Sequence, residues 1–390
     1  MNFYELALEI NEETVKHRRF FHENAETGLD TSLAIGYIKS ELEKCGITPI
    51  DCGHGVSAVI GRSGNTILLR ADMDALDIPE ESGEPFACKN GMAHACGHDL
   101  HAAMLLSSAK ILKRHEDSLC GRVKLMFQPA EETLEGCNDM VENMILEDPK
   151  VLAAVSFHVT SGRIPIGTLM YNSGKVMMNS ADVFKIEIFG RGGHGAYPNL
   201  AVDPLIAASY ICMALSSLPG REASPDASCA LTIGRFSSGK NPNVIPETAI
   251  LEGALRTDDA NARKHLVKRI YGITDGIAKS FGCTSKLTMR AQVPALVCDS
   301  ALTDEAVSYI TQVLPETNVI PNMKASASED FAVIAQRVPS TMIYLSAGFL
   351  DERGDYAQHN PRVRFNEEAL PIGTAAYAAV AWNWLKNHSE

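Results

Sequence analysis

The stretch Met92-Ala-His-Ala-Cys-Gly-His-Asp-Leu-His101 places a thiol and an imidazole two residues apart, at Cys96 and His98. An apolar run with helical spacing follows directly, over 102–112. Thiolate and neutral imidazole are preferred ligands of zinc and its neighbours in the first transition row. A Cys-x-His pair is weak by itself, and it predicts a metal site only if other parts of the chain supply further ligands.

Carboxylate and imidazole side chains follow predicted strands elsewhere in the chain. They are Asp72 and Asp74 after the run 67–69, Glu131 and Glu132 after 122–127, His158 after 151–157, and His359 after 341–345. In open α/β sheets, reactive residues collect at the strand ends and in the loops that follow. The sequence therefore predicts that these side chains meet Cys96 and His98 at one edge of a sheet.

Short unbroken apolar runs alternate with helical stretches in the first half of the chain and again near its end. This alternation is typical of an α/β fold with a mixed, mostly parallel sheet covered on both faces. Helices are expected over 2–22, from a cap at Asp30-Thr31 to Gly46, over 301–314, after a cap at Ser328, and after a cap at Asn366.

The pattern changes near Ser180. Strands are expected over 181–189, 230–236, 248–256 and 285–291, with helices over 203–218 and 260–281. This β-α-β-β-α-β order is the ferredoxin-like pattern. The segment 181–291 is therefore expected to be an inserted domain, with 1–180 and 292–390 forming the catalytic, metal-binding domain.

Composition excludes several classes of protein. With 390 residues, 45% hydrophobic and 21% charged, the chain is expected to be a soluble protein of two domains. A net charge of −13 argues against a nucleic-acid partner, and no apolar run is long enough for a membrane helix. Ten cysteines without framework spacing and an acidic N-terminus unlike a signal peptide favour the cytoplasm.

Each candidate residue also has a simpler interpretation. Adjacent residues leaving a strand point to opposite sides, so one of Glu131 and Glu132 is expected to bind metal while the other faces substrate; alternatively, the pair is a solvated acidic loop. A histidine ending an apolar strand, as His158 does, is more often a hydrogen-bonded core residue than a ligand. Asp72 and Asp74 either orient ligands or cap a turn. His94 and His101 are expected to support the site or lie at the surface.

Five motifs occur in an order that resembles the M20 metallopeptidase family, specifically its amidohydrolase branch. They are Arg70-Ala-Asp-Met-Asp-Ala-Leu76, Ala95-Cys-Gly-His-Asp-Leu-His101, Phe127-Gln-Pro-Ala-Glu-Glu132, Gly192-Gly-His-Gly-Ala-Tyr-Pro198 and Ser328-Glu-Asp-Phe331. The branch includes hippurate hydrolases, N-acyl-amino-acid amidohydrolases and plant auxin-conjugate hydrolases. The resemblance implies a zinc-exopeptidase-like catalytic domain with a two-metal site, and an inserted ferredoxin-like lid that makes a homodimer or larger homo-oligomer.

The resemblance also implies a role for individual residues. The metal ligands are expected to be Cys96, His98, Glu132, His158 and His359. Glu131 matches the general base, and Asp74 the carboxylate that supports the metals. His194 matches a lid histidine that reaches a substrate oxygen, either in the active site of its own chain or in that of the partner chain. Asn243 and Arg256 match lid positions associated with the substrate's carboxylate.

The implied activity is hydrolysis of N-acyl (acetyl, benzoyl or similar) amino acids by metal-activated water, with two divalent ions of zinc, manganese, cobalt or nickel. A dipeptidase or carboxypeptidase on the same two-metal site stays open, and so does an inactive metal-binding scaffold. Two departures from the branch, Asp77-Ile-Pro79 and His22-Glu-Asn-Ala-Glu26, leave the preferred substrate in doubt.

Overall fold

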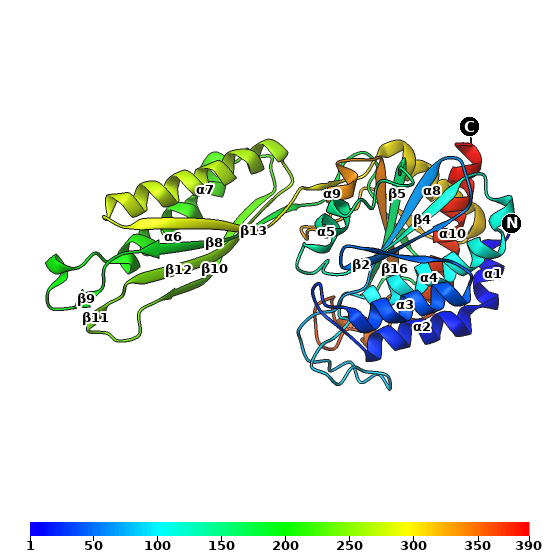
Figure 1. Ribbon diagram of the computed structural model, residues 1–390, viewed down its shortest axis with the longest axis horizontal. Coiled ribbons are helices and arrows are strands. Elements are labelled where there is room, and N and C mark those ends of the chain that lie inside the picture. The colour runs from blue at the N-terminus through cyan, green and yellow to red at the C-terminus, as the bar shows by residue number, and fades with distance from the viewer. Residues whose placement is uncertain (390) are drawn as a thin grey trace. The chain divides into compact units, whose positions relative to one another are not determined.

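The computed structural model describes residues 1–389 and divides into two compact units (Figure 1). The larger unit comprises Met1–Met177, Val297–Lys324 and the chain from Asp330 onward, and the smaller comprises Met178–Leu296 and Ala325–Glu329. The expected insertion 181–291 lies inside the smaller unit. The segment Ala325–Glu329 also belongs to the smaller unit, which the sequence pattern does not predict.

The larger unit is built on an eight-stranded sheet in the order β1-β2-β4-β3-β5-β16-β6-β15. The strands are β1 Pro49–Cys52, β2 Gly55–Ile60, β3 Thr66–Asp72, β4 Arg122–Gln128, β5 Ala153–Thr160, β6 Leu169–Met170, β15 Val319–Ile320 and β16 Ser340–Ser346. The central pairs β4-β3, β3-β5 and β5-β16 are parallel, whereas β1-β2, β2-β4 and β16-β6 are antiparallel. The predicted mixed, mostly parallel sheet is confirmed.

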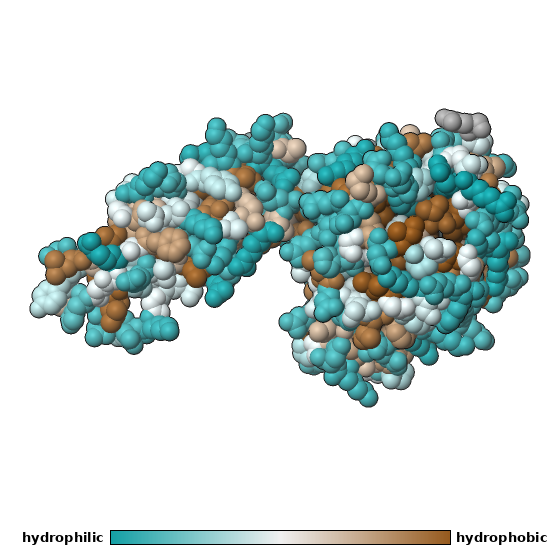
Figure 2. Space-filling view, viewed as in Figure 1, coloured by the Kyte–Doolittle hydropathy of each residue, from teal (hydrophilic) through white to brown (hydrophobic). Residues whose placement is uncertain are grey.

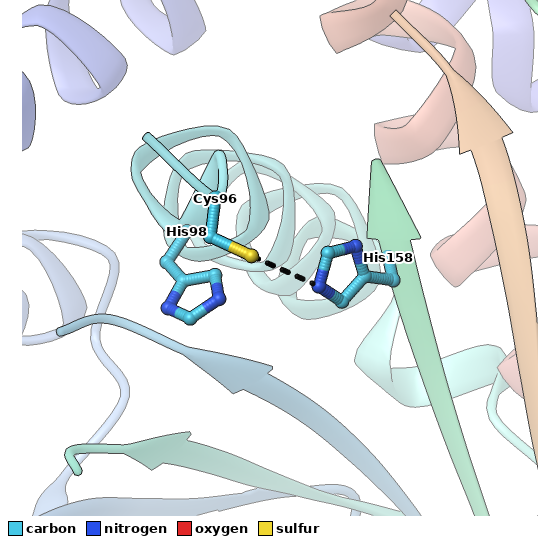
Figure 3. A group of neighbouring side chains, drawn as sticks. All are labelled: Cys96, His98 and His158. Atoms are coloured by element: carbon cyan, nitrogen blue, oxygen red, sulfur yellow. Dashed lines mark hydrogen bonds between the residues drawn. The ribbon is translucent and has the colours of Figure 1, made fainter. Parts of the chain in front are cut away.

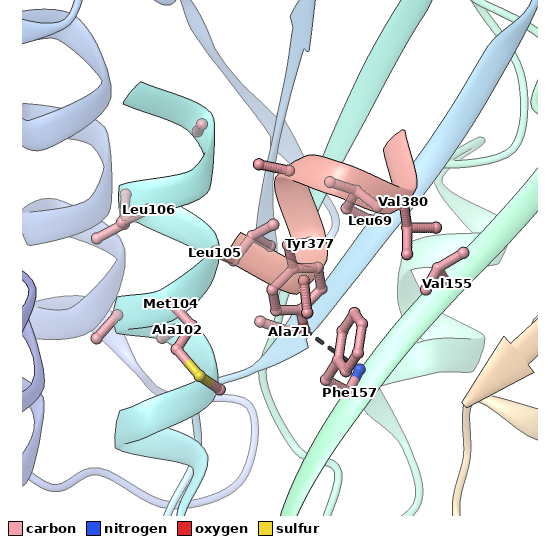
Figure 4. Close-up of a cluster of buried hydrophobic side chains, with 14 of the residues drawn as sticks. Leu69, Ala71, Ala102, Met104, Leu105, Leu106, Val155, Phe157, Tyr377 and Val380 are labelled. Carbon is pink, nitrogen blue, oxygen red and sulfur yellow. Dashed lines mark hydrogen bonds between the residues drawn. The ribbon is translucent and has the colours of Figure 1, made fainter. Parts of the chain in front are cut away.

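Two helices pack directly on the centre of this sheet, α4 (His98–Arg114) and α10 (Ala369–Asn387). Figure 4 shows Leu105 of α4 and Tyr377 of α10 among the buried side chains of β3 and β5. Gly373 permits the close approach, since a Cβ there would lie 1.9 Å from the sulfur of Met104. The remaining helices of the unit are α1 Phe3–Glu9, α2 Asn11–Glu23, α3 Ser32–Lys44, α5 Gly136–Glu142, α8 Ser300–Val313 and α9 Ala332–Ala335.

Some predicted helix boundaries and caps are wrong, although α3 begins and ends where expected. The helix expected over 2–22 is two helices that break at Ile10. The α3 helix is not capped by the Asp30 or Thr31 side chain; instead, the carboxylate of Glu26 accepts hydrogen bonds from the backbone amides of Leu33 and Ala34.

The expected caps of the last two helices also differ. The α9 helix begins only at Ala332, and the Ser328 hydroxyl accepts a hydrogen bond from Arg256 instead of capping it. Asn366 shapes the turn before α10 by accepting from the backbone of Glu368, but it does not cap the helix.

The smaller unit is a four-stranded antiparallel sheet in the order β10-β12-β8-β13, with two helices on one face. Its elements are β8 Ser180–Phe189, α6 Pro204–Glu222, β10 Cys229–Ser238, β12 Thr248–Thr257, α7 Ala260–Ser280 and β13 Thr284–Val293. The order and connections are those of the predicted ferredoxin-like fold. A separate pair of short strands, β9 Gly193–His194 and β11 Val244–Ile245, extends from it.

Two short strands, β7 Val176–Met178 and β14 Leu296–Val297, lie where the chain passes from one unit to the other. Single 3-10 turns occur at Glu116–Ser118, Pro198–Leu200 and Glu352–Asp355. Hydrophilic residues predominate on the face shown in Figure 2. Among the described residues, no helix combines the length and hydropathy that crossing a bilayer requires.

Candidate metal centre

A tight turn at the start of α4 presents the two residues of the Cys-x-His pair. Gly97 between them has a φ of 89°, a conformation that favours glycine. A Cβ at Gly97 would also meet the Val159 side chain at 2.4 Å. The glycine thus lets the turn lie against β5, so that Cys96 and His98 reach the end of the sheet.

Strand β5 brings His158 to the same place (Figure 3). The Cys96 sulfur lies 3.6 Å from Nε2 of His158, and the three side chains of Cys96, His98 and His158 are buried. Their ligand atoms lie within 4.8 Å of one another, which is close enough for one metal ion to bind all three.

Cys96 also belongs to a second group of this kind, with Glu132 and His359. Nε2 of His359 lies 3.5 Å from Oε1 of Glu132. His98, Glu131 and Glu132 form a third group. The structure therefore brings together all five predicted ligands and the predicted base from four separate parts of the chain.

Hydrogen bonds fix which nitrogen of each histidine faces the centre. Nδ1 of His98 donates to the backbone carbonyl of Asp74 (2.9 Å), and Nδ1 of His158 donates to that of Val159 (2.7 Å). Both rings therefore turn Nε2 inward, and this is the nitrogen that a metal ion would bind.

Two buried polar atoms at the centre lack a hydrogen-bond partner among residues 1–389. They are Nε2 of His98 and Oε1 of Glu132, which lie 3.9 Å apart. An unpartnered buried polar atom is costly unless something satisfies it. A thiolate, imidazoles and carboxylates suit divalent ions of the first transition row, so the residues present fit two such ions.

The two glutamates do not point to opposite sides, and that expectation is wrong. Glu131 and Glu132 both approach Nε2 of His98, at 4.0 and 3.9 Å. The cause is that the chain leaves the extended conformation right after β4: Ala130 has a φ of 54°, and a turn replaces the strand. Alternation of side chains holds only within a strand.

Asp74 holds this turn. Its carboxylate accepts hydrogen bonds from the backbone amides of Glu131 (3.0 Å) and Glu132 (3.1 Å). The interpretation of Asp74 as a turn cap is therefore confirmed, and the turn that it caps carries both glutamates. Its side chain is not one of the metal-facing groups described above.

Burial and neighbouring charges shift the pKa values of the ligands. Burial, with Glu132 nearby, raises the pKa of the Cys96 thiol well above its usual value. Burial lowers the pKa of His98, but Asp72 and Cys96 outweigh it and raise that pKa well above the usual range. Burial and His101 hold the pKa of His158 well below it. A metal ion must therefore displace protons from Cys96 and His98 but not from His158.

His101 forms a further candidate metal group with Asp72 and His98, but both of its ring nitrogens are hydrogen-bonded. Its Nδ1 bonds the carboxylate of Asp72, and its Nε2 accepts from the backbone amide of Val159 (2.7 Å). His94 is buried as well, and burial lowers its pKa to about 4. The interpretation of both histidines as surface residues is thus wrong, and the supporting interpretation holds for His101.

Gln358 and Arg70 contribute contacts that the sequence does not predict. The amide of Gln358 donates to the backbone carbonyl of Cys96 (3.2 Å) and approaches its sulfur (3.6 Å). Arg70 is fully buried and binds Asp72 (2.8 Å). The one available signal was position, since Gln358 precedes His359 and Arg70 opens the first motif.

The smaller unit brings together two of the three predicted lid residues. His194 in β9 pairs with Val244 in β11, and the carbonyl of Asn243 accepts from the backbone of Gly195 (2.8 Å). The glycine-rich segment around His194 thus contains a short paired strand, with His194 exposed on it. Arg256 lies elsewhere in the unit, on β12, and donates to Ser328 (2.7 Å).

Comparison with known proteins agrees with this geometry. The model of peptidase family M20/M25/M40 matches residues 68–383. The chain is 34% identical to N-acetyl-L-cysteine deacetylase of Bacillus subtilis over 93% of this chain and 85% of that protein. It is 30% identical to thermostable carboxypeptidase 2 of Saccharolobus solfataricus over 96% of this chain and 95% of that protein.

A solved structure shares the fold over nearly the whole chain. It is that of the Bacillus subtilis YXEP protein, described as a dinuclear metal-binding peptidase of the M20 family. The TM-score is 0.78 at 28% identity, covering 97% of this chain and 99% of that one. The chain therefore belongs to peptidase family M20/M25/M40, in its amidohydrolase branch, and is a metal-dependent amidohydrolase.

Proposed function

We propose that this enzyme hydrolyses the amide bond of N-acyl amino acids, giving a carboxylic acid and a free amino acid. One observation carries the proposal: Nε2 of His98 and Oε1 of Glu132 are buried without a partner among the described residues, beside Cys96 and His158. The similarity to a deacetylase of an N-acetyl amino acid supports the substrate class.

The proposed ligands are Cys96, His98, Glu132, His158 and His359. Two divalent ions held there would lower the pKa of a water molecule toward neutrality and polarise the amide carbonyl. Zinc, manganese, cobalt and nickel all suit this mixed set of soft and hard donors.

Glu131 is the proposed general base. It takes the proton from the attacking water and then delivers it to the leaving amine nitrogen, so the proton is conserved over the reaction. The hydrogen bond from its backbone amide to Asp74 holds the turn, and its carboxylate lies 4.0 Å from Nε2 of His98. His194 is the proposed donor to the developing oxyanion, with Asn243 and Arg256 binding the substrate's carboxylate.

Carboxypeptidase or dipeptidase activity is the second candidate, because a thermostable carboxypeptidase is among the relatives. A panel of acetyl, benzoyl and aminoacyl amino acids, assayed with added Mn²⁺, Zn²⁺, Co²⁺ or Ni²⁺, separates the candidates. We expect the acetyl or benzoyl compounds to be cleaved fastest. Preference for aminoacyl compounds would favour the second candidate, and no hydrolysis of any compound would indicate an inactive scaffold.

The enzyme is also proposed to lie in the cytoplasm and to form a homodimer or larger homo-oligomer. The smaller unit would act as a lid and would make the contact between the subunits. All ten cysteines are free thiols, as a reducing compartment favours. The α6 helix exposes Ile206, Tyr210 and Met213 at helical spacing, an apolar stripe suited to burial against a second copy. Light scattering coupled to size-exclusion chromatography should give a mass at least twice that of one chain.

A further inference from the structure

Asp330 closes the two ends of the loop that carries both glutamates. Nε2 of Gln128, the last residue of β4, lies 2.8 Å from each of its carboxylate oxygens. The backbone amide of Cys137, in the first turn of α5, donates to the same carboxylate (2.9 Å). Glu131 and Glu132 lie between these two anchors, so the position of Asp330 sets the span of their loop.

A second set of contacts runs from Asp330 toward His158. Nη2 of Arg70 donates to Asp330 (3.1 Å), while its Nη1 donates to Asp72 (2.8 Å). Asp72 in turn bonds His101, whose other nitrogen accepts the backbone amide of Val159. The carbonyl of Val159 holds Nδ1 of His158 and thereby directs its Nε2 to the centre.

Every side chain along this second set is buried, and each hydrogen bond joins a donor to an acceptor. In such a buried network, displacement of one side chain is expected to displace its hydrogen-bonded neighbour, because little water is present to replace a lost hydrogen bond. Asp330 is also the first residue of the larger unit after the chain returns from the smaller one at Glu329. The network therefore starts at the crossing between the units and ends at the metal-facing side chains.

We propose that Asp330 is a positioning residue of the metal centre, holding the Glu131–Glu132 loop directly and His158 through Arg70, Asp72 and His101. This role rests on the proposed two-metal function. It predicts that loss of the Asp330 carboxylate weakens metal binding and turnover without removing any ligand. Supporting groups of this kind typically contribute about 10- to 100-fold to metal affinity or activity.

The test is Asp330→Asn in the full-length protein. Asparagine keeps only one acceptor oxygen, so it cannot accept from both the Cys137 amide and Arg70, and one of the two sets of contacts should be lost. Competition with a chelating indicator, using Mn²⁺ and Zn²⁺ as probes, should show affinity about 10-fold weaker or more. Turnover of an N-acetyl amino acid at saturating metal should fall by a similar factor, with KM nearly unchanged.

Asp182→Asn is the matched control. Asp182 is equally buried and is also bonded by an arginine and an amide side chain, Arg263 and Gln292, but it lies in the smaller unit. It should lose thermal stability while keeping wild-type metal affinity. If Asp330→Asn does the same, with only the melting temperature lowered, Asp330 is a structural residue and the proposal is overturned.

Gln128→Met serves if Asp330→Asn does not fold. It removes one anchor of the loop at constant volume, and it should weaken metal affinity by a smaller factor. Wild-type affinity in a folded Gln128→Met chain would contradict the proposal. If the wild type cleaves no substrate of the panel, the proposed function fails, but the difference in metal affinity still decides the role of Asp330.

Discussion

At the scale of single residues, the protons on Cys96 and His98 compete with the metal ions. The pKa of each is raised above its usual value in the metal-free protein, so both groups are protonated near neutral pH. Metal binding must release these protons, and apparent affinity should rise with pH by roughly tenfold per pH unit for each proton displaced. Chelator competition at pH 6.5, 7.5 and 8.5 measures this slope. An affinity independent of pH would mean that neither group is a ligand.

Residue types and strand ends indicated a candidate cluster, but each residue also had a simpler interpretation, and the full ligand set followed only from the resemblance to the M20 family. The orientation of these residues could not be predicted. The positive φ of Ala130 turns Glu131 and Glu132 to the same side, and no residue type in that loop requires it. The contact of Gln358 with Cys96 joins residues far apart in the chain, so sequence spacing carries no trace of it.

At the scale of elements, a buried ionic cluster fastens α2 to the start of α4. His22 lies between Asp99 (2.8 Å) and Glu80 (2.9 Å). Burial opposes its charge, but the two carboxylates outweigh burial and raise its pKa to about 9. The motif His22-Glu-Asn-Ala-Glu26, one of the two departures from the family branch, thus begins with a residue of this ionic cluster. The cluster includes Asp99, which directly follows His98 in the sequence.

This cluster predicts how stability depends on pH. Because the pKa of His22 is higher in the folded protein than its unfolded value of about 6.5, the folded state binds more protons between these values. Its stabilising contribution should be complete below about pH 6.5 and be lost as pH rises through about 9. Urea unfolding of the metal-free protein should show this decline, and His22→Gln should flatten it. An equal decline in the variant would assign the effect to other groups.

Helix ends were predicted less well than helices. The 3.6-residue spacing continues across Ile10, so it does not reveal the break between α1 and α2. The cap of α3 comes from Glu26, several residues before the helix, whereas the usual signal is a short polar side chain immediately before it. Both cases depend on tertiary contacts that a local pattern does not contain.

At the scale of the whole molecule, the α/β texture and the β-α-β-β-α-β order were sufficient to predict both folds. Strand length and hydrophobic pattern are local properties, and the connection rules leave few arrangements for them. The segment Ala325–Glu329 is different: it belongs to the smaller unit although the chain around it belongs to the larger. Its own composition does not distinguish it from a loop.

His194 is expected to act mainly in the transition state, because it lies exposed on the β9–β11 pair of the smaller unit. His194→Ala should therefore lower kcat much more than it raises KM. Unchanged kcat would reduce it to a residue of the turn. Mixing inactive Glu131→Gln and His194→Ala chains tests the oligomer as well, since recovered activity requires His194 to act on the partner's site.

The central claim, that Glu131 is the base of a two-metal amidohydrolase, is tested most directly by the turnover of metal-saturated Glu131→Gln. Glutamine keeps the size of the side chain but does not accept the proton. We expect turnover to fall by about 100-fold or more while two metal ions per chain remain. Wild-type turnover, or loss of the metals from Glu131→Gln while Glu132→Gln retains them, would contradict the assignment.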